Sequence, residues 1–261
     1  MKIQAKKSLG QHFLNSKHVL DQIVSAAEIK NGDLVLEIGP GTGVLTRALL
    51  ENGAKVLAIE KDSRAIGLLQ EKFSSEIDSG QLKLLEEDIL GFSDYPEQQF
   101  SVVANIPYYI TGAILEKFLG HNPRPEKMVL LVQREVAERI VARNGKESIL
   151  SISVKAFGTP KIVAVVPPGA FTPPPSVDSA IIAISNVSSN LFQKEAMVEP
   201  FFKIVRSGFA HKRKILIRNL EESTDPSRLS EIWENFGLNQ KVRAEDLKVS
   251  DWLLICKNIL G

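Results

Sequence analysis

The sequence lacks the features that mark membrane proteins and disulfide-stabilised proteins. No run of 18 apolar residues occurs in its 261 residues, which excludes a transmembrane helix. The first twenty residues contain no continuous apolar stretch, so we expect no secretory signal. The single cysteine, Cys256, excludes a disulfide framework and a cysteine-rich metal site, and no other ligand cluster resembles a metal site. We therefore expect a cytoplasmic globular protein without a bound metal.

The chain also lacks an overall excess of positive charge, because 32 Lys and Arg face 31 Asp and Glu and the net charge is +1. The charges are unevenly distributed, however. Residues 1–18 contain four bases and no acid, residues 19–185 contain 16 bases and 21 acids, and residues 186–261 contain 12 bases and 10 acids. Because basic ends flank an acidic middle, the small net charge does not exclude a polyanionic partner such as a nucleic acid.

The acidic middle alternates short apolar runs with helical patterns, which predicts a doubly wound α/β domain. We expect helices between almost wholly apolar strands, as in a parallel sheet that is covered on both faces. The predicted strands are Leu34–Ile38, Val56–Glu60, Leu82–Glu86, Phe100–Ala104 and Met128–Val132, and later Ile162–Val166 and Ala180–Ile184. The predicted helices are Val44–Glu51, Ser63–Phe73, Ile110–Leu119 and Glu135–Ala142.

The last part of the chain has a different character. A loop that contains five of the thirteen prolines separates the last two predicted strands, and it should be stiff because proline fixes φ. From about residue 190 the pattern predicts short helices. We expect a catalytic domain with its basic arm over residues 1–188, and a small helical domain over residues 189–261.

A glycine-rich turn, Glu37-Ile38-Gly39-Pro40-Gly41-Thr42-Gly43, directly follows the first predicted strand and precedes a helix. Such turns bind nucleotides in doubly wound sheets, because glycine lets the backbone approach a ligand and the helix N-terminus offers free N–H groups. Gly39, Gly41 and Gly43 are thus candidate cofactor residues. Glu37 could hydrogen-bond near the cofactor or cap the turn.

Two acids at the ends of the next strands favour an adenosine-containing cofactor. Glu60 can accept both hydrogens of a ribose diol, and Asp88 can meet an adenine amino group. The fourth strand ends in Asn105-Ile106-Pro107-Tyr108. The Asn105 carbonyl and a backbone carbonyl of the proline-fixed turn can each accept one N–H of an exocyclic amine, while Tyr108 offers a stacking face. This combination is typical of alkylation of an aromatic amino group.

The chain closely resembles the KsgA type of ribosomal RNA adenine dimethyltransferase. The resemblance rests on five stretches in chain order: SLGQHFL (8–14), EIGPGTG (37–43), NIPYYIT (105–111), FTPPPSVDSA (171–180) and FAHKRKILIRNL (209–220). It implies a Rossmann-like class I methyltransferase domain. It also implies transfer of methyl groups from S-adenosyl-L-methionine to N6 of two adjacent adenosines near the 3′ end of small-subunit rRNA, during subunit biogenesis.

The resemblance also implies residue roles. Cofactor contacts fall on His12, Leu14, Gly39, Glu60, Asp88 and Asn105, where His12 replaces an asparagine that many members have. Phe171 would face the target base opposite Tyr108. Because RNA affinity comes largely from phosphate contacts, we expect a helical basic cluster and the N-terminal arm to bind RNA, through Lys6, Lys7, Lys212, Arg213, Lys214 and Arg218. The expected partner is the small ribosomal subunit particle, approached by a monomer.

Three alternatives remain. An adenine methyltransferase of the erythromycin-resistance type, which acts on large-subunit rRNA, shares the NIPY turn but fits the proline loop and the HKRK segment less well. A non-catalytic RNA-binding factor in ribosome assembly does not require the intact glycine turn and NIPY. A nicotinamide-dependent oxidoreductase would have the spacing GxGxxG where this chain has GxGxG, and it leaves NIPY unexplained.

Overall fold

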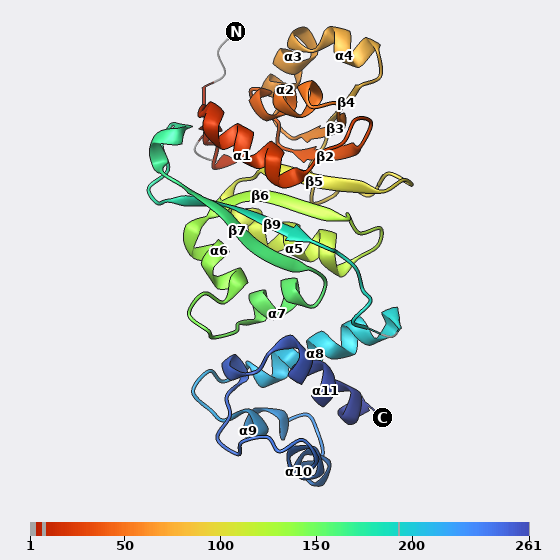
Figure 1. The fold of residues 1–261 in the computed structure, drawn as a ribbon, viewed down its shortest axis with the longest axis vertical. Helices are drawn as coiled ribbons and strands as arrows, with labels where there is room; N and C mark the ends of the chain where they lie inside the picture. Colours follow the sequence, from red (N-terminus) through yellow and green to blue (C-terminus); the bar gives the residue numbers. More distant parts are fainter. Residues whose placement is uncertain (1–3, 7–8, 193, 261) are drawn as a thin grey trace. The chain divides into compact units, whose positions relative to one another are not determined.

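A computed structural model describes residues 4–6, 9–192 and 194–260 of the chain. Its main feature is a seven-stranded sheet in the order β4-β3-β2-β5-β6-β9-β7 (Figure 1). The strands from β2 to β6 run parallel, and β9 is antiparallel to both of its neighbours, β6 and β7. The bounds are Leu34–Ile38 for β2, Lys55–Glu60 for β3, Leu82–Glu86 for β4, Phe100–Asn105 for β5, Lys127–Gln133 for β6, Thr159–Val166 for β7 and Ser179–Ser185 for β9.

The sheet confirms the α/β prediction and all seven predicted strands to within three residues at either end. In the central strand β5, Val102, Val103 and Ala104 are fully buried although they point to opposite faces of the sheet. Both faces of the sheet are therefore covered, which explains why its strands read as continuous apolar runs.

Helices connect the strands, and the four predicted ones are present as α2, α3, α5 and α6. The helix α1 was not predicted, although Ser16 caps it by accepting from the Val19 N–H and its apolar residues recur at helical spacing. The bounds are Lys17–Ala27 for α1, Val44–Glu51 for α2, Ser63–Lys72 for α3, Ser74–Asp78 for α4, Thr111–Gly120 for α5, Arg134–Val141 for α6 and Ile149–Lys155 for α7.

A second, two-stranded sheet ties the N-terminal arm to the proline-rich loop. Strand β1 (Phe13–Leu14) pairs antiparallel with β8 (Phe171–Thr172), and Leu14 lies opposite Phe171. Neither strand was predicted, because two residues carry no periodicity that could be recognised in the sequence. This pairing brings residues 9–14 beside the main sheet, where they help to form the site described below.

The chain divides into two compact units. The first comprises residues 1–137 and 159–187, and the second comprises residues 138–158 and 188–261. The second unit thus joins residues 188–261 with the earlier stretch 138–158, which holds the end of α6 and all of α7 and which the sequence analysis assigned to the first domain. Its other helices are α8 (Val198–Gly208), α9 (Leu216–Leu220), α10 (Pro226–Asn235) and α11 (Val249–Leu260).

The basic HKRK segment of the second unit is not helical, contrary to our expectation. Residues 211–214 form an exposed turn between α8 and α9. The reason is local: α8 ends at Gly208, whose missing side chain leaves room for the Trp252 ring, and the chain turns before α9 starts at Leu216. Within the described part of the chain, no helix has the length and apolarity needed to cross a membrane.

Candidate active site

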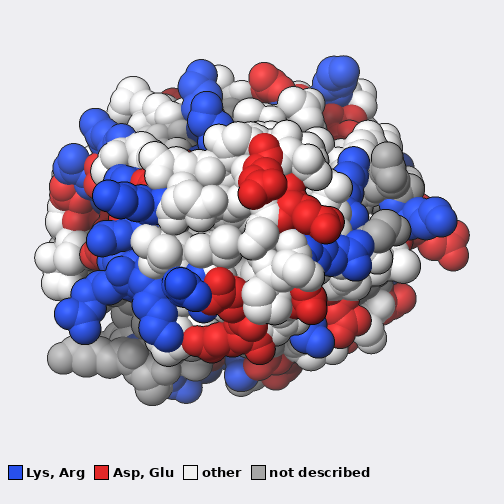
Figure 2. All heavy atoms as spheres, turned by 90° about the horizontal axis from the view of Figure 1, so that it is seen from below, with Lys and Arg blue, Asp and Glu red and all other residues white. Residues whose placement is uncertain are grey.

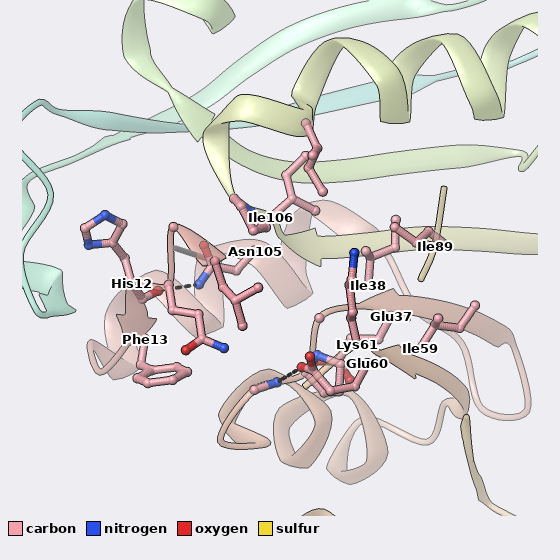
Figure 3. Close-up of a pocket in the computed structure, with 18 of the residues that line it drawn as sticks. His12, Phe13, Glu37, Ile38, Ile59, Glu60, Lys61, Ile89, Asn105 and Ile106 are labelled. Carbon is pink, nitrogen blue, oxygen red and sulfur yellow. Dashed lines mark hydrogen bonds between the residues drawn. The ribbon is translucent and has the colours of Figure 1, made fainter. Parts of the chain in front are cut away.

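A pocket in the first unit lies at the carboxyl ends of β2, β3 and β5 (Figure 3). The strand order reverses between β2 and β5. The strands β3 and β4 lie on one side of β2, and the strands that follow them in the sequence lie on the other side. Open α/β sheets bind their ligands at this switch point. The N-terminal arm covers part of the pocket with residues 9–14.

The glycine turn between β2 and α2 forms one wall. Gly39 has a φ of +66° and no other group within 4 Å of the position a Cβ would take, so it leaves the pocket open. Gly41 also lines the pocket, and a Cβ there would lie 3.1 Å from the Phe13 ring. Gly43 does not line the pocket. Its role is to make room for the Phe73 and Leu69 side chains, which a Cβ would meet at 2.5 and 2.7 Å.

Glu37 lies under this turn and is 1 % exposed. Neither of its carboxylate oxygens has a hydrogen-bond partner of good geometry among the described residues. Burial raises the pKa of Glu37 to about 8, with the Thr46 side chain and N–H opposing the shift and the Glu60 charge reinforcing it. At neutral pH this carboxyl is therefore mostly protonated, and a positively charged ligand in the pocket would favour its ionised form.

Glu60 ends β3 and is held by backbone donors. Its Oε2 accepts from the Gly41 N–H at 3.0 Å (Figure 3). Its Oε1 accepts from the Asp62 N–H at 2.8 Å. Burial raises the pKa of Glu60, and these N–H groups oppose the shift. The first of these bonds joins the glycine turn to the neighbouring strand end and so fixes the position of both.

Asp88 lines the pocket beyond β4 and forms an ion pair with the exposed Lys61 at 2.7 Å. Its other oxygen accepts from the Leu90 N–H at 3.0 Å. These contacts lower the pKa of Asp88, with the hydrogen bond from Lys61 as the largest cause. Asp88 is therefore an ionised hydrogen-bond acceptor. It follows β4, whereas Asn105 ends β5, and the strands β3 and β2 lie between these two.

Asn105 is the last residue of β5, and its side chain is oriented by the N-terminal arm. Its Nδ2 donates to the backbone carbonyl of His12 at 3.0 Å (Figure 3). Because this bond uses the amide nitrogen, the amide oxygen is the atom left to accept a hydrogen bond from a ligand. The structure thus brings two residues predicted for the site together and fixes which end of Asn105 is available.

The backbone carbonyl that could act with Asn105 belongs to Ile106 rather than to Pro107. The Pro107 oxygen accepts from the Ile110 N–H at 3.2 Å, because the chain forms a turn of 3-10 helix over Tyr108–Ile110. No hydrogen bond to the Ile106 oxygen occurs within the described residues. Pro107 lines the pocket, but its contribution is to shape this turn.

Tyr108 lies beside the pocket with its hydroxyl 2.6 Å from the Ser179 hydroxyl. Burial raises the pKa of Tyr108, and the contact with Ser179 opposes the shift. The His12 ring stacks nearly parallel to the Tyr108 ring, with 5.9 Å between their centroids. His12 Nδ1 lies 2.8 Å from the Pro173 carbonyl, which can only accept, so Nδ1 carries a proton.

Phe171 is not placed where the sequence analysis expected it. Its ring is 3 % exposed and packs in the apolar core, since β8 pairs with β1 and turns this side chain inward. It is not among the residues that line the pocket. The ring that the structure places against Tyr108 is that of His12.

The other predicted residues fall in two places. Leu14 and His12 line the pocket, and the exposed Lys6 precedes the arm there, whereas Lys7 lies outside the described residues. Lys212, Arg213, Lys214 and Arg218 are exposed on the second unit. Lys214 pairs with Glu222 at 3.3 Å and Arg218 with Glu221 at 2.8 Å, while Lys212 and Arg213 form no ion pair within the described chain.

Sequence reasoning missed Phe13 and Ser179. Phe13 packs on Gly41, and Ser179 holds the Tyr108 hydroxyl, yet both belong to the motifs SLGQHFL and FTPPPSVDSA that carried the resemblance. Their roles depend on pairings between distant parts of the chain, which residue type alone does not reveal.

The sequence matches the family described as ribosomal RNA adenine dimethylase over residues 2–260. The chain belongs to this family. It is 42 % identical to ribosomal RNA small subunit methyltransferase A of Dehalococcoides mccartyi strain CBDB1, over 99 % of this chain and 90 % of that protein. It is 39 % identical to the protein of the same name from Thermosynechococcus vestitus, over 97 % of this chain and 96 % of that one.

Solved structures agree with this assignment. A dimethyladenosine transferase from Plasmodium falciparum superposes with a TM-score of 0.80 at 30 % identity, over 94 % of this chain and 96 % of that chain. The 23S rRNA methyltransferase ErmE superposes with a TM-score of 0.79 at 26 % identity, over 95 % and 100 %. The fold is that of a class I S-adenosylmethionine-dependent methyltransferase, and the sequence relatives favour the KsgA type over the erythromycin-resistance type.

The pocket fits S-adenosylmethionine. The open position at Gly39 leaves room at the glycine turn, and the unpaired carboxyl of Glu37 and the carboxylates of Glu60 and Asp88 suit a cationic ligand that also bears a diol and an amine. When bound, this cofactor supplies an activated methyl group.

Proposed function

We propose that the protein dimethylates N6 of two adjacent adenosines near the 3′ end of small-subunit rRNA, within small-subunit particles in the cytoplasm. The single observation that carries this proposal is the hydrogen bond from Asn105 to the His12 carbonyl, because it leaves the amide oxygen of this pocket-lining residue as the acceptor. The names of the relatives support the choice of the small subunit.

The proposed chemistry depends on two acceptors. In the first transfer the Asn105 amide oxygen and the Ile106 carbonyl each accept one hydrogen of the adenine amino group, and in the second transfer one of them accepts the hydrogen that remains. The nitrogen lone pair is then localised and directed at the methyl carbon. A bond forms between N6 and this carbon as the carbon–sulfur bond breaks, and the amino group afterwards releases a proton. Alignment of the reacting atoms is the main contribution of the protein.

The base must leave its stack before it can enter the pocket, at a cost of a few kcal/mol. Stacking on an aromatic ring returns about 1–3 kcal/mol per base. Tyr108 is the aromatic residue proposed for this contact, and its hydroxyl is already held by Ser179 at 2.6 Å. The ring is therefore in place before the base arrives.

Six basic residues are proposed to bind phosphates: Lys6, Lys7, Lys212, Arg213, Lys214 and Arg218. On the face drawn in Figure 2, Lys and Arg side chains gather toward one side, which is a distribution suited to a polyanion. We further propose that the second unit serves RNA binding and that the protein acts as a monomer.

Transfer of labelled methyl groups tests this proposal. Purified protein is given S-adenosylmethionine and either unmethylated small-subunit particles or free large-subunit rRNA, and the labelled nucleosides are identified. We expect dimethyladenosine in the small-subunit RNA alone, and a loss of rate on the order of 100-fold in Asn105→Ala. Label in the large-subunit RNA would favour the erythromycin-resistance type. Absence of label from both substrates would favour an RNA-binding assembly factor.

A further inference from the structure

Tyr109 is exposed to an unusual degree for an aromatic side chain beside a pocket. It is 71 % exposed, more than any other large apolar residue in the described part of the chain. It follows Tyr108 directly and lines the same pocket. The two neighbouring tyrosines are used differently, because Tyr108 is half-buried and anchored by Ser179, whereas Tyr109 faces solvent at the rim.

The Tyr109 ring is supported on one side by the N-terminal arm. A Cβ on Gly10 would lie 3.3 Å from Cε1 and 3.4 Å from Cδ1 of this ring, so the backbone at Gly10 is in close contact with it. Gly10 has a φ of +60°, which favours glycine. The arm therefore packs against the ring and limits its movement, while the remainder of the ring stays accessible.

No contact within the described chain explains why this ring should be aromatic. No hydrogen bond from the Tyr109 hydroxyl and no stacking with another ring occurs among the described residues. Lys61, with 64 % of its side chain exposed, lines the same pocket, and its ammonium group forms the ion pair with Asp88 at 2.7 Å. A held aromatic ring next to a cation is the arrangement with which proteins bind single-stranded nucleotides.

We propose that the Tyr109 ring stacks on the base of the nucleotide that flanks the target adenosine. This inference rests on the proposed function. When the target base leaves its stack and enters the pocket at Tyr108, the flanking base loses one stacking partner. The ring of Tyr109, which follows Tyr108 in the protein chain, takes the place of the target adenine as the stacking partner of the flanking base. In a pair of adjacent adenosines the flanking base is the second adenine, whose face can stack on the ring.

Binding of a synthetic RNA hairpin with 2-aminopurine next to the target adenosine tests the proposal without turnover, because stacking quenches the fluorescence of this base. We expect quenching by the wild type and by Tyr109→Phe, and little quenching by Tyr109→Ala. With unmethylated small-subunit particles, Tyr109→Ala should raise KM by about 5-fold to 100-fold with kcat within about twofold, the range that loss of one stacked base predicts.

The control is Val165→Ala, an exposed apolar residue on β7 of the same unit that does not line the pocket. It should leave KM and quenching unchanged. Equal quenching by the wild type and Tyr109→Ala, or an unchanged KM in Tyr109→Ala, would overturn the inference. A wild type that transfers no methyl group would overturn the proposed function, while the quenching experiment would still decide the role of Tyr109.

Discussion

The side chain of Asn105 donates a hydrogen bond to the backbone carbonyl of His12, 93 residues earlier in the chain, at 3.0 Å. The bond makes the N-terminal arm part of the proposed site, because it orients the Asn105 side chain. Because the contact uses the main chain of His12, it does not depend on which side chain stands at this position.

Replacement of Asn105 by aspartate tests this relationship. The carboxylate cannot donate to the His12 carbonyl and is repelled by it, so the remaining acceptor loses its position. We expect kcat to fall on the order of 100-fold, as for a misplacement of about 1 Å, with a smaller loss of cofactor affinity. Single-turnover rates and calorimetric titration measure the two effects. As a control, Asn52→Asp makes the same change at an exposed helix end and should have no effect on rate. A rate within twofold of wild type for Asn105→Asp would refute this role.

The buried Glu37 predicts a dependence of stability on pH. Its pKa is raised from 4.5 to about 8 by burial. Between these values the unfolded chain has lost the proton while the folded chain keeps it, so the unfolded state binds fewer protons. The free energy of unfolding therefore falls as the pH rises through this window and is unaffected by this group below it.

Glu37→Gln should reduce this dependence, because a neutral amide does not ionise in either state. Urea unfolding of the cofactor-free protein at pH 5 and pH 8 measures how much the free energy of unfolding changes between these pH values. The control is Glu51→Gln at an exposed position, which should show the same change as the wild type. The same loss of stability between these pH values in wild type and Glu37→Gln would show that Glu37 is ionised in the folded protein.

The glycines of the turn should separate stability from cofactor binding. Gly43→Ala places a Cβ 2.5 Å from the Phe73 ring at a φ of +73°, so we expect a loss of about 2–4 kcal/mol from overpacking and backbone strain. The Cβ of Gly39→Ala meets no atom within 4 Å, so this variant should lose only about 1–2 kcal/mol of stability. It should weaken cofactor binding more than Gly43→Ala does, because Gly39 lines the pocket and Gly43 does not. Urea unfolding and cofactor titration of both variants check this order, and equal losses of stability would contradict it.

The turn between α8 and α9 should supply phosphate contacts. Changing Lys212, Arg213 and Lys214 together to alanine should weaken RNA binding and reduce the slope of log affinity against log salt by about 2–3, since each phosphate contact contributes about 0.7–0.9. The control removes three exposed lysines of the first unit, at positions 30, 55 and 83, which changes the net charge equally. Equal slopes for the two triple variants would remove this turn from the RNA interface.

Much of the fold followed from local patterns. The strands and the helices α2, α3, α5 and α6 were predicted because apolar runs and 3.6-residue periodicity depend on neighbouring residues. The helix α1 was within reach of the same reasoning, since Ser16 and the apolar residues after it are a regular start signal. The basic turn at residues 211–214 was expected as helix, because a charged run shows no periodicity that would distinguish the two.

Most of the candidate site could be located from the sequence, because the carboxyl ends of parallel strands meet at one edge of a sheet. This holds for the glycine turn, for the acids at the ends of the next strands, and for Asn105 with its proline turn. Their order along the chain predicted an adenosine-containing cofactor, and the resemblance of the five motifs to a known family added the methyltransferase fold and S-adenosylmethionine. The tertiary structure decided which atoms are free. It assigned the Asn105 nitrogen to His12 and the Pro107 oxygen to a turn, packed Gly43 and Phe171 inward, and left Tyr109 exposed. These outcomes depend on pairings between β1 and β8 and between the arm and β5, and contacts across so many residues leave no local pattern in the sequence.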